Sequence, residues 1–300
     1  MESVGFLGLG KMGTPMAARL LQAGYRLTVW NRSVGNADAL VRDGANLAAS
    51  PADLTNSADI IITMLANDTV TEKIYSGSSG LLIGEVKGKL FIDMSTLRPS
   101  TVSSVCDKVH NAGAHFIDAP VSGTVGPAEK GQLLILCGAS EKDLERAQPM
   151  LEILSRRIVH AGPVGQGSLL KLVVNLPLAV YWGSLAEALA IGTSGGLNLE
   201  LMLDAIRDSS AALAVLPLKT PLILGQTESV AFDVEGMQKD LNSMLQSGQD
   251  CSISLPITTG ALTIYDAAAA GGLGSSDAVE VVNFLIEHAA SQQKNKERKL

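Results

Sequence analysis

The sequence is poor in the residue types that build disulfide frameworks and metal sites. Its 300 residues include only three cysteines, at positions 106, 137 and 251. An odd number at such wide spacing fits neither a disulfide scaffold nor a zinc pattern. The four histidines are also scattered, without the spacing of metal ligands. We therefore expect no metal site.

Basic charge is scarce as well. The chain has 23 Lys and Arg against 30 Asp and Glu, a formal net charge of -7. This balance excludes a general binder of nucleic acid or of an anionic membrane surface. The one basic run, Gln293 to Leu300, is interpreted as a continuation of the last helix. Hydrophobic residues make up 46% and charged residues 18%, which is typical of a globular protein with room for two domains.

No uninterrupted apolar run is long enough for a membrane span. The most apolar stretch, Gly165 to Gly192, contains Asn175, Pro177 and Glu187. The first predicted strand begins almost at Met1, without the pattern of a secretory leader before it. The prediction is a soluble protein of the cytoplasm, bound neither to nucleic acid nor to a membrane.

The start of the chain carries a dinucleotide-binding pattern. Ser3 to Leu9 is predicted to be a buried strand, followed by a glycine-rich turn and a helix that Gly24 ends. Gly8 permits the tight turn, Gly10 lets a pyrophosphate approach the backbone, and Gly13 lets the helix pack on the strand. The helix N-terminus directs N–H groups at the phosphates. The candidates for cofactor contacts are Gly8, Leu9, Gly10, Lys11, Met12 and Gly13.

The end of the second strand, Tyr25 to Asn31, bears on the choice of cofactor. NAD-binding proteins usually carry an acid there, whereas this chain has Asn31, Arg32 and Ser33. An acid would repel a 2′-phosphate, while an arginine and a hydroxyl can bind one. The pattern favours NADP over NAD. The alternative is that Arg32 is a solvated loop arginine.

Further strands are predicted to alternate with helices. Asp59 to Met64 and Leu90 to Asp93 are apolar strands, and the carboxyl ends of parallel strands line the ligand crevice of an open sheet. Cofactor candidates at these ends are Leu65, Ala66 and Thr96. A third strand, starting at His115, runs into a loop of small residues that could hold an anion or be a plain turn. This loop contains Ser122, Gly123 and Thr124.

A shift in composition at Gly162 to Gly165 divides the chain. Residues 1–163 are predicted to form a doubly wound α/β domain of the Rossmann type. Residues 164–300 are predicted to form an all-α domain that begins with a long interdomain helix. Lys171 and Asn175 lie four residues apart on that helix and project from one face. Pro177 is expected to kink it. The later helices are predicted at Leu199–Asp208, Leu216–Leu224, Val234–Ser247, Pro256–Ala270 and Ser276–Ala289.

Four sequence blocks closely resemble the β-hydroxyacid dehydrogenases, the group of 3-hydroxyisobutyrate dehydrogenases, tartronate semialdehyde reductases and glyoxylate/succinic semialdehyde reductases. They occur in the same order and at similar spacing over nearly the whole chain. The blocks are FLGLGKMGTPMA (Phe6–Ala17), DAPVSGTVGPAEKGQL (Asp118–Leu133), GQGSLLKLVVN (Gly165–Asn175) and FDVEGMQKDL (Phe232–Leu241).

The resemblance implies hydride exchange between a nicotinamide and a small β-hydroxyacid or its semialdehyde or oxoacid. Lys171 falls on the family's catalytic lysine and Asn175 on its partner asparagine. The loop with Ser122, Gly123 and Thr124 falls on the segment that holds the substrate carboxylate. The resemblance also implies contacts with the nicotinamide or substrate for Thr96, Phe232, Lys239 and Asp240, and a homodimer or dimer of dimers.

Some positions depart from the family pattern. Thr124 stands where Gly or Ser is common, and Val125-Gly126 replaces a basic pair of some glyoxylate-reducing members, which argues against glyoxylate. Pro177 follows the asparagine, so the pocket wall expected at 178–182 could suit a bulkier substrate. The alternatives are an imine reductase, in which Asp or Tyr usually replaces the lysine, and a non-catalytic dinucleotide-binding module, which would lose it.

Overall fold

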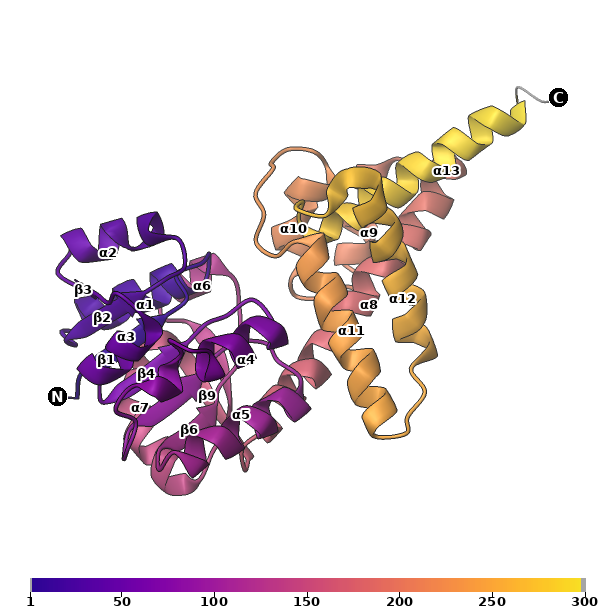
Figure 1. The fold of residues 1–300 in the computed structure, drawn as a ribbon. Coiled ribbons are helices and arrows are strands. Elements are labelled where there is room, and N and C mark those ends of the chain that lie inside the picture. Colours follow the sequence, from indigo (N-terminus) through magenta and orange to yellow (C-terminus); the bar gives the residue numbers. More distant parts are fainter. Residues whose placement is uncertain (1, 298–300) are drawn as a thin grey trace. The chain divides into compact units, whose positions relative to one another are not determined.

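The computed structural model describes residues 2–297, with the side chains of residues 2–292. The basic run Gln293–Leu300 therefore lies outside the described side chains, and its last three residues lie outside the described part of the chain. The chain divides into two units, Met1–Val173 and Val174–Leu300 (Figure 1). This division falls within the long helix, whereas the shift in composition at Gly162 to Gly165 precedes it.

The first unit is built on a mostly parallel sheet, which confirms the predicted Rossmann-type fold. Within the described residues the sheet has nine strands in the order β3-β2-β1-β4-β5-β6-β8-β7, with β9 paired to β8. The reversal of strand order beside β1 is the topological switch point of a doubly wound sheet. The strands are β1 (Val4–Leu7), β2 (Leu27–Trp30), β3 (Asn46–Leu47), β4 (Ile60–Thr63), β5 (Leu90–Asp93), β6 (His115–Asp118), β7 (Val121–Ser122), β8 (Leu133–Gly138) and β9 (Ser155–Gly162).

The central strands are apolar on both faces because helices cover both. Successive side chains of a strand point to opposite faces, and β4 divides accordingly. Ile60 and Ile62 belong to one core cluster, and Ile61 to the other. Each buried side chain of this size contributes about 1.5–3 kcal/mol. The helices of this unit are α1 (Gly13–Gln22), α2 (Asp38–Arg42), α3 (Pro51–Ser57), α4 (Asp68–Ser76), α5 (Pro99–Asn111), α6 (Val125–Glu129) and α7 (Glu141–Leu154).

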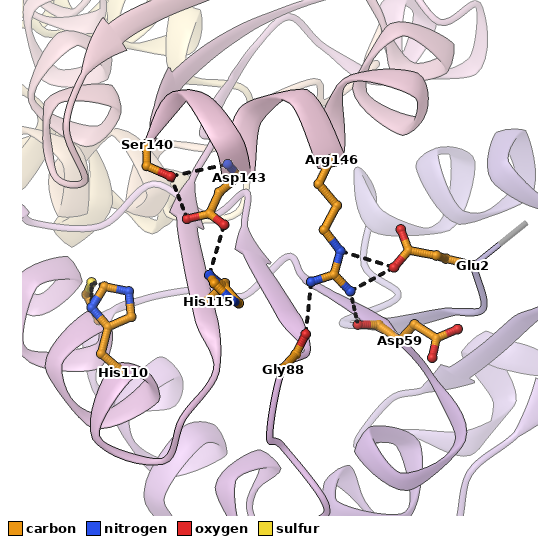
Figure 2. A network of polar contacts seen from close by, with 9 residues as sticks. Glu2, Asp59, Gly88, His110, His115, Ser140, Asp143 and Arg146 are labelled. Carbon is orange, nitrogen blue, oxygen red and sulfur yellow. Dashed lines mark hydrogen bonds and ion pairs between the residues drawn. The ribbon is translucent and has the colours of Figure 1, made fainter.

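A network of polar contacts joins α7 to the amino ends of the strands (Figure 2). The Arg146 guanidinium donates to the Glu2 carboxylate at 2.7 Å and to the Gly88 carbonyl at 2.9 Å. Nearby, His115 contacts the Asp143 carboxylate at 2.9 Å. Glu2, Gly88 and His115 lie just before or at the starts of β1, β5 and β6. This network stabilises the amino ends of the strands, whereas the predicted ligand contacts follow their carboxyl ends.

The second unit is helical, as predicted. Helix α8 (Gln166–Ser194) enters it from the first unit and continues without a break past Pro177. By length and composition alone α8 could cross a membrane. The same properties belong to the core helix of a soluble protein, and Ala179, Trp182 and Leu189 of α8 are buried. The other helices are α9 (Leu199–Arg207), α10 (Leu216–Ile223), α11 (Val234–Asp250), α12 (Pro256–Ala268) and α13 (Val281–Glu297).

The structure corrects the expected elements at three places. Val121–Ser122, predicted as part of a loop, forms strand β7 and pairs with β8. The helix expected at Ser276–Ala289 is a 3-10 turn, Ala278–Glu280, followed by α13. Helix α12 ends at Ala268, and a π-helical turn at Ala269–Leu273 replaces its predicted last residues. The turn accommodates Gly272 at φ 93°, a conformation that favours glycine.

Candidate functional site

The glycine-rich turn between β1 and α1 has the predicted steric character. Gly8 adopts φ 100°, and a Cβ on it would collide with the carbonyl of Met64. A Cβ on Gly13 would collide with the Gly8 carbonyl, so the helix packs closely on the turn. A Cβ on Gly10 would meet nothing within 4 Å. The turn therefore leaves open space beside Gly10 and fits the approach of a pyrophosphate.

Asn31, at the end of β2, connects the glycine-rich turn with the segment predicted to hold a 2′-phosphate. Its side-chain oxygen accepts from the Leu9 N–H at 2.9 Å, and its amide donates to the Ser33 carbonyl at 3.0 Å. Arg32 and Ser33 are both exposed. An acidic residue in this place could accept from Leu9 but could not donate to Ser33. Asn31 therefore orders the segment without adding negative charge.

Asp93, the last residue of β5, organises the carboxyl ends of β4 and β5. Its carboxylate is 1% exposed and accepts from the Thr63 hydroxyl at 2.7 Å and the Ser95 N–H at 2.9 Å. The Ser95 hydroxyl in turn accepts from the Leu65 N–H at 2.8 Å. The cofactor candidates Leu65, Ala66 and Thr96 follow these two strands directly. Asp93 thus fixes the starts of their loops through its hydrogen bonds to Thr63 and Ser95.

Burial raises the pKa of Asp93 from 3.8 to about 6, against the opposing effect of its hydrogen bonds. The folded protein therefore binds this proton more tightly than the unfolded chain. The resulting stabilisation is complete below about pH 4 and is lost as the pH rises through 6. Asp93→Asn keeps an acceptor for Ser95 and offers a donor to Thr63. As the pH rises from 4 to 7, the free energy of unfolding of Asp93→Asn should increase relative to that of the wild type by about 2 kcal/mol, measured by urea denaturation.

Asp59→Asn is the control of opposite sign. Hydrogen bonds from the Ser3 N–H and hydroxyl lower the pKa of Asp59, so it stabilises the fold above its unfolded-state pKa and ceases to do so as the pH falls. Its replacement should destabilise the protein at neutral pH and matter less in acid. If the free energy of unfolding had the same pH dependence in the wild type and in Asp93→Asn, the pKa of Asp93 would not differ between the folded and the unfolded chain.

The predicted substrate loop leaves the carboxyl end of β6. Ser122 lies in β7, opposite Leu134 of β8. Gly123 has φ 142°, and a Cβ on it would lie 2.8 Å from the Leu133 side chain. Gly123 and Thr124 are exposed. The loop thus presents small polar groups from a backbone that β8 holds in place.

Asp118 joins this loop to helix α8. Its carboxylate is 1% exposed and accepts from the Gly165 and Ser168 N–H groups, both at 2.7 Å. Burial raises the pKa of Asp118, and these backbone hydrogen bonds act against the rise. A Cβ on Gly167 would lie 2.5 Å from the Leu136 carbonyl, so α8 starts in direct contact with the sheet.

Lys171 lies three residues beyond Ser168 on α8, about one helical turn further along. Its side chain is only 7% exposed, although it carries an ammonium group. A buried ammonium is costly unless its surroundings stabilise the charge. Asp118 therefore determines where α8 begins and hence where Lys171 lies.

Asn175, Lys239 and Asp240 meet in the second unit. The Asn175 amide donates to the Asp240 carboxylate at 3.0 Å. The other oxygen of this carboxylate contacts the Lys239 ammonium at 3.1 Å. Asp240 is 1% exposed. This geometry is that of a carboxylate orienting Asn175 and Lys239; direct binding of substrate by Asp240 stays a prediction.

Phe232 is held through its backbone by a buried ion pair. The Lys219 ammonium lies 2.6 Å from the Asp277 carboxylate, which also accepts from the Ala231 N–H at 2.9 Å. The Ala278 N–H donates to the Phe232 carbonyl at 2.8 Å. The Phe232 ring is 38% exposed and lies against Gly236, where a Cβ would be 2.7 Å from it. The ion pair therefore supports the start of α11, which carries Lys239 and Asp240.

The structure thus collects the predicted residues into two sets. The first unit holds the glycine-rich turn, the Asn31–Ser33 segment, the three loop candidates, the substrate loop and Lys171. The second unit holds Asn175, Phe232, Lys239 and Asp240. Sequence reasoning missed the roles of Asp93 and Asp118. Their signal was present, because both end an apolar strand with the tripeptide Phe-Ile-Asp, and a carboxylate at a buried strand end needs hydrogen-bond donors.

Comparison with known families assigns both parts of the chain. Residues 3–162 match the NAD binding domain of 6-phosphogluconate dehydrogenase. Residues 165–285 match the family described as NAD-binding of NADP-dependent 3-hydroxyisobutyrate dehydrogenase. Among the described residues, no group of three or more His, Cys, Asp or Glu side chains could hold a metal ion.

Individual relatives match over most of their length. Glyoxylate/succinic semialdehyde reductase 2, chloroplastic, of Arabidopsis thaliana is 33% identical, over 94% of this chain and 79% of its own. The 3-hydroxyisobutyrate dehydrogenase of Pseudomonas aeruginosa is 37% identical, over 86% and 89%. The solved structure of Psf3 in complex with NADP+ and 2-OPP is 27% identical, with a TM-score of 0.84 over 94% and 99%.

Proposed function

Because the chain belongs to the β-hydroxyacid dehydrogenase family and is an NAD(P)-dependent oxidoreductase of CH–OH groups, we propose that it uses NADP and that Lys171 is its general acid and base. The substrate is a small β-hydroxyacid or the corresponding semialdehyde or oxoacid. The observation that carries this proposal is the buried Lys171, one turn beyond the start of α8 that Asp118 anchors.

Bound NADPH supplies the hydride for reduction. As hydride reaches the carbonyl carbon of the substrate, negative charge develops on the carbonyl oxygen. The Lys171 ammonium stabilises this charge and donates its proton; in the oxidative direction the neutral amine accepts the hydroxyl proton. Ser122 and Thr124 supply hydroxyl donors, and Gly123 a backbone N–H, to the substrate carboxylate. Asn175, oriented by Asp240, orients the reacting hydroxyl group without adding a charge.

The preference for NADP rests on the segment after β2. Asn31 occupies the position at which an acid would favour NAD, and Arg32 and Ser33 follow it on an exposed segment. The relative Psf3 has been solved with NADP+. A guanidinium and a hydroxyl form charge-assisted hydrogen bonds with a phosphate, which the 2′-hydroxyl of NAD cannot match.

A screen of NADPH oxidation tests the proposal. The substrates are succinic, methylmalonate and tartronate semialdehydes, glyoxylate and cyclic imines, each repeated with NADH. We expect reduction of a semialdehyde with NADPH and weaker reduction of glyoxylate, because Val125 and Gly126 offer no charge to it. Reduction of imines alone would favour the imine reductase alternative. Absence of turnover with every compound, despite nucleotide binding, would favour a non-catalytic module.

A homodimer or dimer of dimers is part of the proposal. In the second unit Ile191, Leu201 and Ile257 are large apolar side chains with more than half of their surface exposed. A second copy covering such side chains would remove apolar surface from water. Sedimentation velocity should give a species of at least twice the 31.2 kDa of the chain. A monomer at micromolar concentration would contradict this part of the proposal.

A further inference from the structure

Two asparagines hold the peptide groups of Leu9, the second residue of the glycine-rich turn. The Asn31 side-chain oxygen accepts from the Leu9 N–H at 2.9 Å. The Asn36 amide donates to the Leu9 carbonyl at 2.8 Å. Both asparagines belong to the connection between β2 and α2, on either side of Arg32 and Ser33. The connection is thus tied to the turn before and after the two residues predicted to bind a 2′-phosphate.

Between these ties the connection has few interactions of its own. It forms a single 3-10 turn at Val34–Ala37, in which the Asn36 N–H donates to the Ser33 carbonyl at 3.3 Å. Ala37 is buried in the core at its far end. Arg32, Ser33, Val34 and Gly35 are all exposed. A short exposed segment of this kind samples many conformations unless side chains restrain it.

The two ties act on different parts of the nucleotide site. Asn31 continues strand β2 and binds both Leu9 and Ser33, so it keeps the glycine-rich turn in place even when Asn36 is absent. The bond from Asn36 adds a second contact to Leu9 and restrains the far side of the segment, which Asn31 does not reach. Its loss should therefore disturb Arg32 and Ser33 more than the turn beside the pyrophosphate.

We propose that Asn36 is a specificity-determining residue, which selects nucleotides carrying a 2′-phosphate by tying the Arg32–Ala37 segment to the Leu9 carbonyl. This inference rests on the proposed use of NADP. The restrained segment has its conformational entropy already reduced before the nucleotide arrives, so Arg32 and Ser33 are held ready for the phosphate. A nucleotide without the 2′-phosphate does not contact Arg32 and Ser33 in this way, so its affinity should not depend on the bond from Asn36.

Calorimetric titration with 2′,5′-ADP and 5′-AMP tests the proposal. These probes differ in the 2′-phosphate and lack the nicotinamide, so the measurement does not depend on turnover. Asn36→Ala should bind 2′,5′-ADP about fivefold more weakly, the value of one ordinary hydrogen bond, and 5′-AMP with little change. Asn36→Asp, which cannot donate to Leu9 and adds a negative charge, should lower the preference for 2′,5′-ADP further.

Asn46→Ala is the matched control, since Asn46 is an exposed asparagine on β3 of the same unit. It should leave both affinities unchanged. Equal losses for the two probes in Asn36→Ala, or no loss at all, would overturn the proposal. If Arg32→Ala abolishes the preference and Asn36→Ala does not, the inference fails while the proposed cofactor stands. If the wild type binds both probes equally, the 2′-phosphate site itself is wrong.

Discussion

Replacing Lys171 with alanine is expected to reduce turnover about a hundredfold or more, the scale on which acid–base catalysis is lost. In the proposed mechanism the variant lacks the proton donor and the positive charge that stabilises the developing oxyanion. NADPH binding should change little, because the glycine-rich turn and the segment after β2 are separate from α8.

The measurement is single-turnover reduction of the best substrate of the screen, with NADPH affinity from fluorescence titration. Lys142→Ala, an exposed lysine on α7, is the control and should retain wild-type turnover. Wild-type turnover in Lys171→Ala would show that another group supplies the proton. A loss of nucleotide affinity equal to the loss of turnover would show that Lys171 acts on binding rather than on the chemical step.

Arg32→Ala is expected to weaken NADPH binding by about tenfold to a hundredfold, because a charge-assisted hydrogen bond to the 2′-phosphate is lost. NADH affinity should change less than twofold. The preference would thus move toward NADH without a gain in NADH binding. Raising the ionic strength should reduce the wild-type preference for NADPH more than that of the variant, since the lost interaction is electrostatic and exposed.

Fluorescence titrations with both nucleotides measure this change. Arg42→Ala, an arginine in the last turn of α2, controls for the loss of one positive charge elsewhere in the same unit. Equal weakening of NADPH and NADH by Arg32→Ala would contradict the assignment of Arg32 to the 2′-phosphate. It would leave Arg32 as a solvated residue of the loop.

Sequence reasoning predicted the parts of this fold that depend on neighbours in the chain. The glycine-rich turn was recognisable because Gly13 meets the Gly8 carbonyl only five residues before it and Gly8 itself adopts a positive φ. The alternation of strands and helices followed from apolar runs between turn residues. Strand β7 was not predicted because it is only two residues long and forms by pairing with β8. Two residues are too few to show the alternation of apolar and polar side chains that indicates a strand.

The contacts that support the site could not be predicted from the sequence. Asp93 and Asp118 are register partners on adjacent strands, yet their carboxylates bind different segments. Asp118 reaches Gly165, 47 residues away, and Lys219 reaches Asp277 across 58 residues. Such pairs depend on how strands and helices are brought together, which no local pattern specifies. The resemblance to a family supplied candidate site residues, but not the contacts that hold them.

The anchoring of α8 by Asp118 has a consequence for exchanging parts between relatives. A chimera joined at Gly162 to Gly165, where the composition changes, would take Lys171 from one parent and Asp118 from the other. A junction between Val173 and Val174, where the chain divides into its two units, would keep both residues from one parent. The first compact unit therefore extends beyond the change in composition, since it includes the opening two turns of α8.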